Sequence, residues 1–195
     1  MSRPVAVAIT GGIGAGKTEA LRAFARNGAA TVSSDEIVHH LLRRDAVKQA
    51  IVERLGNGVL APSGEIDRGA LGTIVFNDES ALGWLEALLH PLVSAEYLQW
   101  REDLAALPDA PRVSVTEVPL LYETGGDTRF DKVVVITAPA KLRRARSDVA
   151  IDEREGRFLP DREKIERADW SFKNMGSLEE LDAFVKSVMA ELTGE

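Results

Sequence analysis

A glycine-rich loop near the start of the chain constrains its fold more than any other stretch. Residues 11–18 read Gly-Gly-Ile-Gly-Ala-Gly-Lys-Thr and fit the pattern G-x-x-x-x-G-K-[ST]. The preceding stretch, Val5 to Ile9, is small, apolar and partly β-branched, as in a buried parallel strand. The following stretch, Glu19 to Arg26, spaces its apolar residues as an amphipathic helix does. A strand, a glycine loop and a helix in this order predict an α/β fold with parallel strands.

This arrangement suits the binding of phosphate groups. Glycines let the backbone curl so that successive N–H groups point at phosphate oxygens, and the helix N-terminus adds free donors. Lys17 would reach the β- and γ-phosphates, and the Thr18 hydroxyl would be a Mg²⁺ ligand. The complete spacing disfavours the alternative, a glycine-rich turn with a surface lysine. We therefore expect a nucleoside triphosphate, ATP or a relative, to be bound. Its expected contacts are Gly12, Ile13, Gly14, Ala15, Gly16, Lys17 and Thr18.

Composition narrows the classes of function. The 195 residues include no cysteine, which excludes a disulfide framework, a thiolate metal site and a cysteine nucleophile. The net charge of −7 argues against a general nucleic-acid binder. Residues 5–10 are too short for a membrane span, and no other apolar stretch is long enough. We expect one domain over residues 1–195, acting as a cytoplasmic monomer with no nucleic-acid or membrane partner.

Further strands and helices alternate along the chain, except in one block. Strands are predicted at 29–33, 113–118, 132–137 and 170–172, and a capping box at 177–180 opens the last helix. Residues 45–106 carry amphipathic helices and no clear strand. Pro91 is expected to kink or restart the longest of these helices. We interpret the block as an insertion that covers a second substrate.

Asp35 and a run of arginines are candidates for catalysis. Asp35 follows a predicted strand, at the sheet edge where open α/β folds bind ligands; a helix cap is the alternative. Arg143, Arg146 and Arg154 follow the fourth strand. Phosphoryl transfer needs cations on the side away from the glycine loop, whereas a solvated helical face is the alternative for these arginines.

Two further groups of residues leave their roles open. A Walker-B strand would end in an aspartate, but here Glu117 ends the third strand and Glu123 lies beyond it. Either could be the metal's second carboxylate. The three histidines lack metal-ligand spacing, so a structural role is expected for each. His90, which precedes Pro91, is the one that could contact a substrate.

Several segments occur in the order found in one enzyme family. Residues 64–76 contain G-E-I-D-R-G-A-L-G-T-I-V-F, and residues 85–93 contain L-E-A-L-L-H-P-L-V. Residues 117–123 read E-V-P-L-L-Y-E, and residues 168–181 contain A-D-W and N-M-G-S-L-E-E-L. With the glycine loop, these segments make the chain resemble the dephospho-CoA kinase family over almost its whole length.

The resemblance implies a three-layer α/β/α P-loop nucleoside-kinase fold with a five-stranded parallel sheet, a helical CoA-binding insertion at 36–106 and a lid at 139–167. It implies Mg²⁺-dependent transfer of the ATP γ-phosphoryl group to the ribose 3′-hydroxyl of dephospho-CoA, the last step of coenzyme A biosynthesis. Asp35 would be the base or orienter of that hydroxyl, Asn174 and Gly176 would lie at the adenine, and the arginines would cover the transferred group. The acceptor contacts implied are Thr10, Asp35, Asp67, Arg68, His90, Pro119, Leu120 and Leu121.

The sequence departs from the family pattern at two places. Ser33 replaces the first aspartate of a D-x-D segment, so Asp35 would act alone or with Glu117. Phe158 stands where the family has glutamine, after a shortened lid segment. The alternatives are another small-molecule kinase of the same fold, a nucleotide-dependent switch, or a fold that has lost activity. The N-K-x-D run of a GTPase is absent from the sequence.

Overall fold

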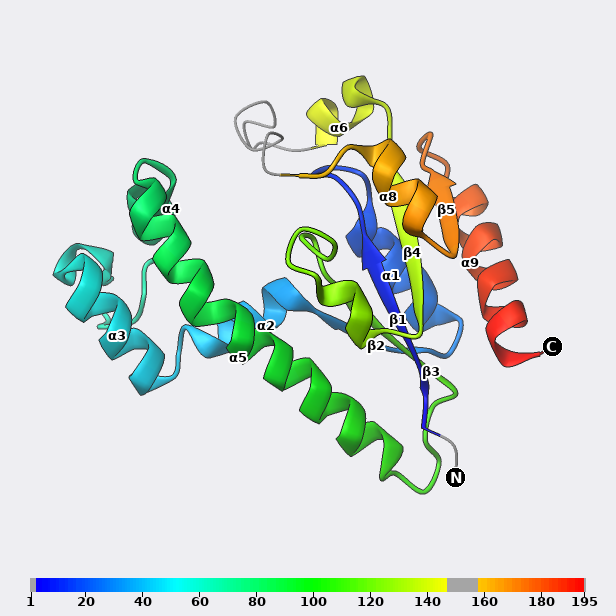
Figure 1. The fold of residues 1–195 in the computed structure, drawn as a ribbon, viewed down its shortest axis with the longest axis horizontal. Coiled ribbons are helices and arrows are strands. Elements are labelled where there is room, and N and C mark those ends of the chain that lie inside the picture. Colours follow the sequence, from blue (N-terminus) through cyan, green and yellow to red (C-terminus); the bar gives the residue numbers. More distant parts are fainter. Residues whose placement is uncertain (1–2, 147–157, 195) are drawn as a thin grey trace. The chain divides into compact units, whose positions relative to one another are not determined.

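A five-stranded parallel sheet organises the computed structural model, which describes residues 3–146 and 158–194 (Figure 1). The strand order is β2-β3-β1-β4-β5. The parallel α/β sheet predicted from the glycine loop is therefore confirmed. The strands are β1 (Val5–Thr10), β2 (Ala30–Ser33), β3 (Val113–Glu117), β4 (Lys132–Thr137) and β5 (Trp170–Lys173).

Strand β1 is the central strand of this sheet, with β3 on one side and β4 on the other. Its residues from Ala6 to Thr10 are buried, as expected for a short apolar run covered on both faces. Ile9 is paired with Glu117 on β3, and Ser33 on β2 is also paired with Glu117. The carboxyl ends of β1, β2 and β3 therefore meet at one edge, and the glycine loop begins there.

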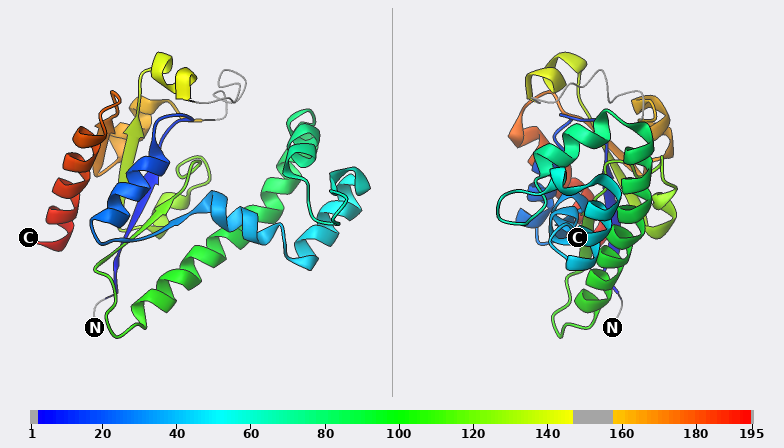
Figure 2. Two further views of the ribbon diagram at one scale, coloured as in Figure 1. Left: turned by 180° about the vertical axis from the view of Figure 1, so that it is seen from behind. Right: turned by 90° about the vertical axis from the view of Figure 1, so that its left-hand side faces the viewer.

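Helices α1 (Lys17–Arg26) and α9 (Leu178–Thr193) pack side by side over one face of the sheet (Figure 2). Phe24 of α1 and Val185 of α9 are fully buried in one apolar cluster with the strands. The hydrophobic stripe of each helix thus faces the sheet. This cluster holds the glycine loop and α1 against the sheet.

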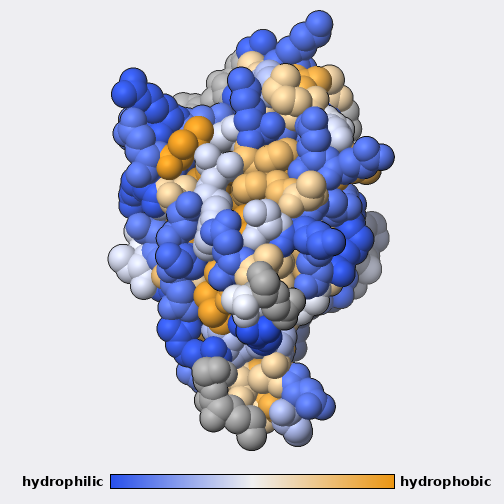
Figure 3. Space-filling view, turned by 90° about the vertical axis from the view of Figure 1, so that its right-hand side faces the viewer, coloured by the Kyte–Doolittle hydropathy of each residue, from blue (hydrophilic) through white to orange (hydrophobic). Residues whose placement is uncertain are grey.

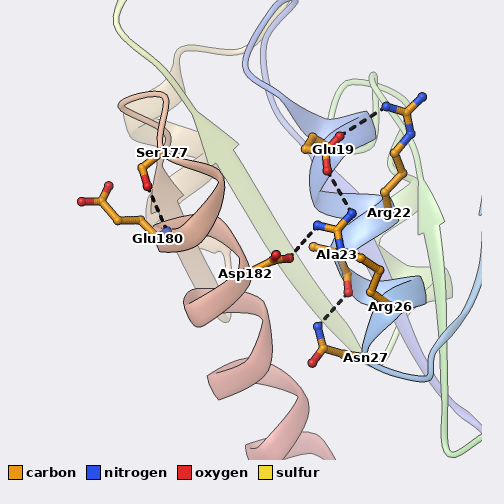
Figure 4. Close-up of polar contacts among 8 residues, drawn as sticks. All are labelled: Glu19, Arg22, Ala23, Arg26, Asn27, Ser177, Glu180 and Asp182. Atoms are coloured by element: carbon orange, nitrogen blue, oxygen red, sulfur yellow. Dashed lines mark hydrogen bonds and ion pairs between the residues drawn. The ribbon is translucent and has the colours of Figure 1, made fainter.

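Polar contacts join the outer surfaces of the same two helices (Figure 4). Arg26 pairs with Glu19 on its own helix at 3.0 Å and with Asp182 on α9 at 2.6 Å. The Ser177 hydroxyl accepts the backbone N–H of Glu180 at 3.2 Å, so the N-cap predicted for the last helix is confirmed. These exposed contacts add a polar link between α1 and α9 to their shared apolar packing.

The opposite face of the sheet is covered by the chain that follows β3 and by α8 (Asp161–Arg167). Leu121 and Tyr122 are buried against Ala8 of β1 and two valines of β4. The short helix η2 (Gly126–Arg129) then leads into β4, and α6 (Ala140–Arg146) follows β4. With α1 and α9 on the other face, this gives the three-layer arrangement.

Residues 35–99 make a second compact unit, apart from the unit that holds the sheet. Its core is formed by apolar residues of all four helices, among them Leu41, Ile51, Val75 and Leu89. A bridge between Leu60 and Ile66 is the only strand-like pairing in its described residues. Its elements are α2 (Ser34–Leu41), α3 (Asp45–Leu55), η1 (Asn57–Val59), α4 (Arg68–Phe76) and α5 (Glu79–Ala105), of which the last helix extends beyond the unit.

Helix α5 does not restart at Pro91 but runs through it for 27 residues. Proline removes one backbone hydrogen bond, and Leu85, Leu89, Val93 and Tyr97 are buried along the helix on both sides of it. Their packing stabilises one continuous helix. Over the described residues, no helix is both long and apolar enough to span a membrane.

Candidate nucleotide-binding and catalytic site

The glycine loop turns tightly between β1 and α1. Gly14 has a φ of +71° and Gly16 a φ of +100°, values in the left-handed region that glycine adopts without strain. The N–H of Ala15 donates to the carbonyl of Gly12 at 3.3 Å. Helix α1 then begins at Lys17, so its first N–H groups lie at the loop. This backbone shape is the one expected of a phosphate-binding loop.

Lys17 is folded back over this loop. Its Nζ donates a hydrogen bond to the carbonyl of Gly12 at 3.1 Å, and only 9% of the residue is exposed. A lysine held this way places a positive charge beside the backbone N–H groups. A triphosphate in the loop would find cation and donors together.

A hydroxyl and a carboxylate meet next to the loop. The Thr18 hydroxyl donates to Oε2 of Glu117 at 3.4 Å, and Glu117 is buried at the end of β3. These oxygen atoms fit Mg²⁺, which takes few protein ligands and keeps waters or substrate phosphates. No group of three or more His, Cys, Asp or Glu side chains suited to a metal occurs in the described parts of the chain. Of the two glutamates left open by the sequence, Glu117 is the one beside Thr18, whereas Glu123 pairs with Lys164.

Arg143 on α6 packs directly against the glycine loop. A β-carbon placed on Gly12 would lie 2.5 Å from Nη1 of Arg143, and one on Gly14 would lie 2.6 Å from the Arg143 carbonyl oxygen. Gly14 therefore needs glycine, because the nearby atom is backbone and its φ is left-handed, whereas at Gly12 the nearby atom is the end of a flexible arginine side chain. A pocket of about 320 Å³ opens here, lined by Gly12, Ile13, Arg143 and residues 158–161.

Arg146 lies at a different part of the loop. The Nδ2 of Asn174 donates to the carbonyl of Ala15 at 2.9 Å, and the N–H of Gly176 donates to Oδ1 of Asn174 at 3.0 Å. A β-carbon on Gly176 would lie 3.4 Å from Nη2 of Arg146. Arg143 and Arg146 thus occupy separate places, one at the start of the loop and one at the Asn174–Gly176 turn. Arg154 lies outside the described residues.

The segment after β3 is mostly part of the core. The Thr10 hydroxyl is fully buried and donates to the carbonyl of Pro119 at 3.1 Å, and Leu121 is fully buried. Thr10 and Leu121 therefore contribute to the packing of the unit that contains the sheet. Pro119 and Leu120 are half-buried. Burial raises the pKa of Tyr122 to about 12, so its hydroxyl stays protonated near neutral pH.

The remaining sequence candidates belong to the helical unit. Asp35 is exposed in the first turn of α2, two residues after the end of β2. Oδ1 of Asp67 accepts the N–H groups of Gly69 and Ala70 at 2.8 and 3.0 Å, which makes it the N-cap of α4. His90 is exposed on α5. The carboxylate of Asp67 thus has a capping role that the sequence motif did not indicate.

Arg68 lines a pocket of about 240 Å³ within the same unit. The sequence identified Arg68 only through the family motif. The pocket brings together a histidine from α2, an arginine from α4 and an arginine from the α2–α3 connection. Its spacing along the chain, from residue 39 to residue 68, gives no local pattern that could have revealed it. The lining residues are His39, Leu42, Arg43, Glu65, Ile66 and Arg68.

Comparisons with known proteins agree over the whole chain. A family model described as dephospho-CoA kinase matches residues 5–180. A dephospho-CoA kinase of Rhodopseudomonas palustris (strain BisB18) is 37% identical over 189 residues, which cover 93% of this chain and 92% of that protein. A crystal structure of a Thermus thermophilus protein is similar with a TM-score of 0.78 and 32% identity, covering 98% of this chain and 99% of that one. Dephospho-CoA kinase from Campylobacter jejuni has a TM-score of 0.71 and 27% identity, covering 97% and 98%.

Proposed function

Because this chain belongs to the dephospho-CoA kinase family, we propose that the residues described above carry out that family's reaction. ATP phosphorylates dephospho-CoA at its ribose 3′-hydroxyl, which yields coenzyme A and ADP. The observation that carries the proposal is the convergence of Lys17, Arg143 and the Thr18–Glu117 pair on one glycine loop. Phosphoryl transfer requires positioning and charge neutralisation more than covalent chemistry, and these groups can provide both.

In this proposal, Arg143 and Arg146 of α6 contact different parts of the nucleotide. Arg143 lines the pocket beside Gly12 and contacts the transferred phosphoryl group. Arg146, which lies near Gly176, contacts the adenosine end of the nucleotide together with Asn174. Arginine suits both places, because its charge is fixed and its planar group can pair with phosphate or stack on a ring. Arg154 stays a candidate for the same transfer from the lid at residues 139–167.

Thr18 and Glu117 would hold Mg²⁺ in the loaded enzyme. The ion would neutralise charge on the β- and γ-phosphates. Lys17 would add its own charge from the opposite side of the loop, where it is held by the Gly12 carbonyl. Buried groups that change little in position on binding are effective here, because they require no reorganisation during transfer.

Asp35 orients the acceptor hydroxyl and accepts its proton as the phosphoryl group arrives. The helical insertion at 36–106 holds the rest of dephospho-CoA, with Arg68 and His90 as contacts and Asp67 as the residue that positions Arg68 at the start of α4. Ser33 lies at the end of β2, paired with Glu117. We propose that Glu117 therefore supplies the second carboxylate that Ser33 lacks.

We also propose that the enzyme acts as a cytoplasmic monomer. The face shown in Figure 3 is mostly hydrophilic, with smaller hydrophobic areas between charged side chains. Stable subunit interfaces usually bury a larger apolar patch than those on this one face. Size-exclusion chromatography with light scattering tests the monomer directly, and a dimer mass at micromolar concentration would contradict it.

The experiment that tests the function measures ADP release with ATP and Mg²⁺ in a coupled assay. Dephospho-CoA is compared with AMP, CMP, shikimate and adenosine as acceptors, and coenzyme A is identified as product by mass spectrometry. We expect turnover with dephospho-CoA alone. Turnover with another acceptor, or ATP binding without turnover of any acceptor, would overturn the proposal.

A further inference from the structure

A buried ion pair connects the segment after β3 to helix α8. Nζ of Lys164 lies 2.8 Å from Oε1 of Glu123; the Lys164 side chain is fully buried and that of Glu123 is 12% exposed. The angles at this contact fall outside those of a hydrogen bond, so the attraction is mainly ionic. The ring of Phe158 lies 4.9 Å from the same ammonium group. Within the described residues, Oε2 of Glu123 is buried without a hydrogen-bond partner.

A gain in folding stability does not by itself explain why the chain has such a buried ion pair. Removing two charges from water costs several kcal/mol for each ion, and apolar replacements of similar volume are often as stable or more stable. Losing one member is different, because the other charge then stays buried without compensation. Glu123 and Lys164 therefore call for an explanation in terms of what they hold in place.

The pair fixes one wall of the pocket beside the glycine loop. Oε1 of Glu123 also accepts the backbone N–H of Leu159 at 2.8 Å. Leu159 belongs to residues 158–161, which line the same pocket as Gly12 and Arg143. One carboxylate oxygen thus holds the backbone of this wall directly and pairs with Lys164 in the first turn of α8. All of these residues belong to the unit that contains the sheet.

We propose that Glu123 and Lys164 are positioning residues, which set the distance of this wall from the glycine loop so that the pocket fits the terminal phosphate of the nucleotide. The loop backbone and the Arg143 guanidinium in the pocket both attract anions and favour such a ligand, and Asp161 is the one acidic residue in the lining. Neither positioning residue needs to touch a reacting atom. The link to catalysis rests on the proposed function, but the link to nucleotide binding does not.

The test compares nucleotides with and without a γ-phosphate. Glu123→Gln keeps the shape and an oxygen for the Leu159 N–H, but it leaves Lys164 without its counter-charge. We expect the affinity for a non-hydrolysable ATP analogue to fall by about tenfold, with ADP affinity changed by less than about twofold, because a wall displaced by a fraction of an ångström affects only the terminal phosphate. Isothermal titration calorimetry gives both constants, at a temperature where circular dichroism reports each variant folded.

A double variant keeps the proposal testable if Glu123→Gln does not fold. Glu123→Gln with Lys164→Met removes the uncompensated charge and should fold as the wild type does. It should show the same selective loss for the ATP analogue, because the ionic link is still missing. Glu166→Gln is the matched control: this exposed glutamate pairs with Arg162 on the same helix at 2.9 Å, and its loss should change neither constant.

Kinetics separate this inference from the proposed function. The KM for ATP should rise by about tenfold in the folded variants while the KM for dephospho-CoA is unchanged, because only the nucleotide pocket is altered. Equal weakening of ADP and the ATP analogue, or no weakening in a folded variant, would overturn the positioning role. If the wild type fails to phosphorylate dephospho-CoA but Glu123→Gln still shows the selective loss in calorimetry, the proposed function is overturned and the positioning role stands.

Discussion

The two ends of the parallel sheet use charge in different ways. At the carboxyl end, Lys17 and Glu117 are buried beside the glycine loop. At the amino end, Arg3 pairs with Asp131 at 2.6 Å, and both side chains are substantially exposed. Burying a charge costs free energy even where hydrogen bonds compensate part of it, whereas exposed pairs contribute little either way. The difference indicates that the carboxyl end of the sheet binds a ligand, whereas the amino end holds the chain together.

This contrast separates two kinds of measurement. Substitutions at the carboxyl end should reduce activity with little effect on folding. Substitutions at the amino end should change the free energy of unfolding and leave the kinetic constants alone. Each prediction below tests one side of that division, in order of decreasing effect.

Lys17→Ala should have the largest effect. It removes the cation next to the loop N–H groups, and we expect kcat/KM to fall on the order of 10³-fold, as for other lost electrostatic contacts to a transition state. Thermal unfolding should be almost unchanged. A loss of activity that parallels a loss of folded protein would contradict the division; Lys141→Ala, an exposed lysine on α6, is the control.

Asp35→Asn should lower kcat on the order of 10²-fold or more, with little change in ATP affinity, because it removes acid–base assistance at the acceptor hydroxyl. Steady-state kinetics and calorimetry with an ATP analogue give the two numbers. Full activity would remove Asp35 from the mechanism. Glu36→Gln, the next residue in the same helical turn, controls for the change in local charge.

Gly14→Ala should weaken ATP binding by about 10- to 10²-fold, since displacing loop atoms by part of an ångström misplaces the phosphates. The added methyl group would meet the Arg143 carbonyl oxygen at 2.6 Å, in a backbone conformation that alanine rarely adopts. Gly28→Ala also has a positive φ but lies after α1, outside the loop, with nothing within 4 Å, so it controls for general backbone strain. Equal effects of the two substitutions on ATP binding would contradict a specific role of Gly14 in the loop.

Asp131→Asn should have the smallest effect, and only on stability. The Arg3 guanidinium holds the pKa of Asp131 below its ordinary value, and the Ala6 N–H also donates to the carboxylate at 2.8 Å. A lowered folded-state pKa stabilises the fold above the unfolded value of about 3.9, and this contribution is lost as pH falls through the folded pKa. The substitution should therefore cost up to about 1 kcal/mol at pH 7, and less below about pH 4.

Urea unfolding between pH 7 and pH 3 measures that cost. Asp45→Asn is the control, because its side chain is 98% exposed and its pair with Lys48 should be worth almost nothing. A changed KM or kcat in folded Asp131→Asn protein would break the contrast between the two ends.

The sequence predicted the sheet unit well because its signals are local. The strand at residues 132–137 is confirmed at both ends, and the cap at Ser177 is confirmed as well. The conformation of a glycine loop between a strand and a helix can be predicted from its sequence, since left-handed backbone at Gly14 and Gly16 favours glycine. Continuous apolar runs then identify the buried parallel strands.

Long-range packing could not be predicted in the same way. Of the kink or restart expected at Pro91, the restart is wrong, because burial on both sides of the proline outweighs one lost hydrogen bond. Arginines at 143 and 146 read alike in the sequence, yet only the fold places one at Gly12 and the other at Gly176. Lys164 lies in a charged run typical of a solvated helix, and its complete burial depends on Glu123, far away in the chain.

The central position of β1 has a consequence for how the protein is made. Strand β1 spans residues 5–10 and leaves the ribosome first, but its neighbours β3 and β4 begin only at residues 113 and 132. Residues 35–99, a compact unit by themselves, emerge completely before either neighbour does. During translation the nascent chain therefore carries an unpaired apolar strand until β3 has been made, and its glycine loop lacks the neighbouring strands on both sides until β4 has emerged. Stalling or truncation before that point would leave an open strand edge, the kind of surface that chaperones recognise and that aggregates form on.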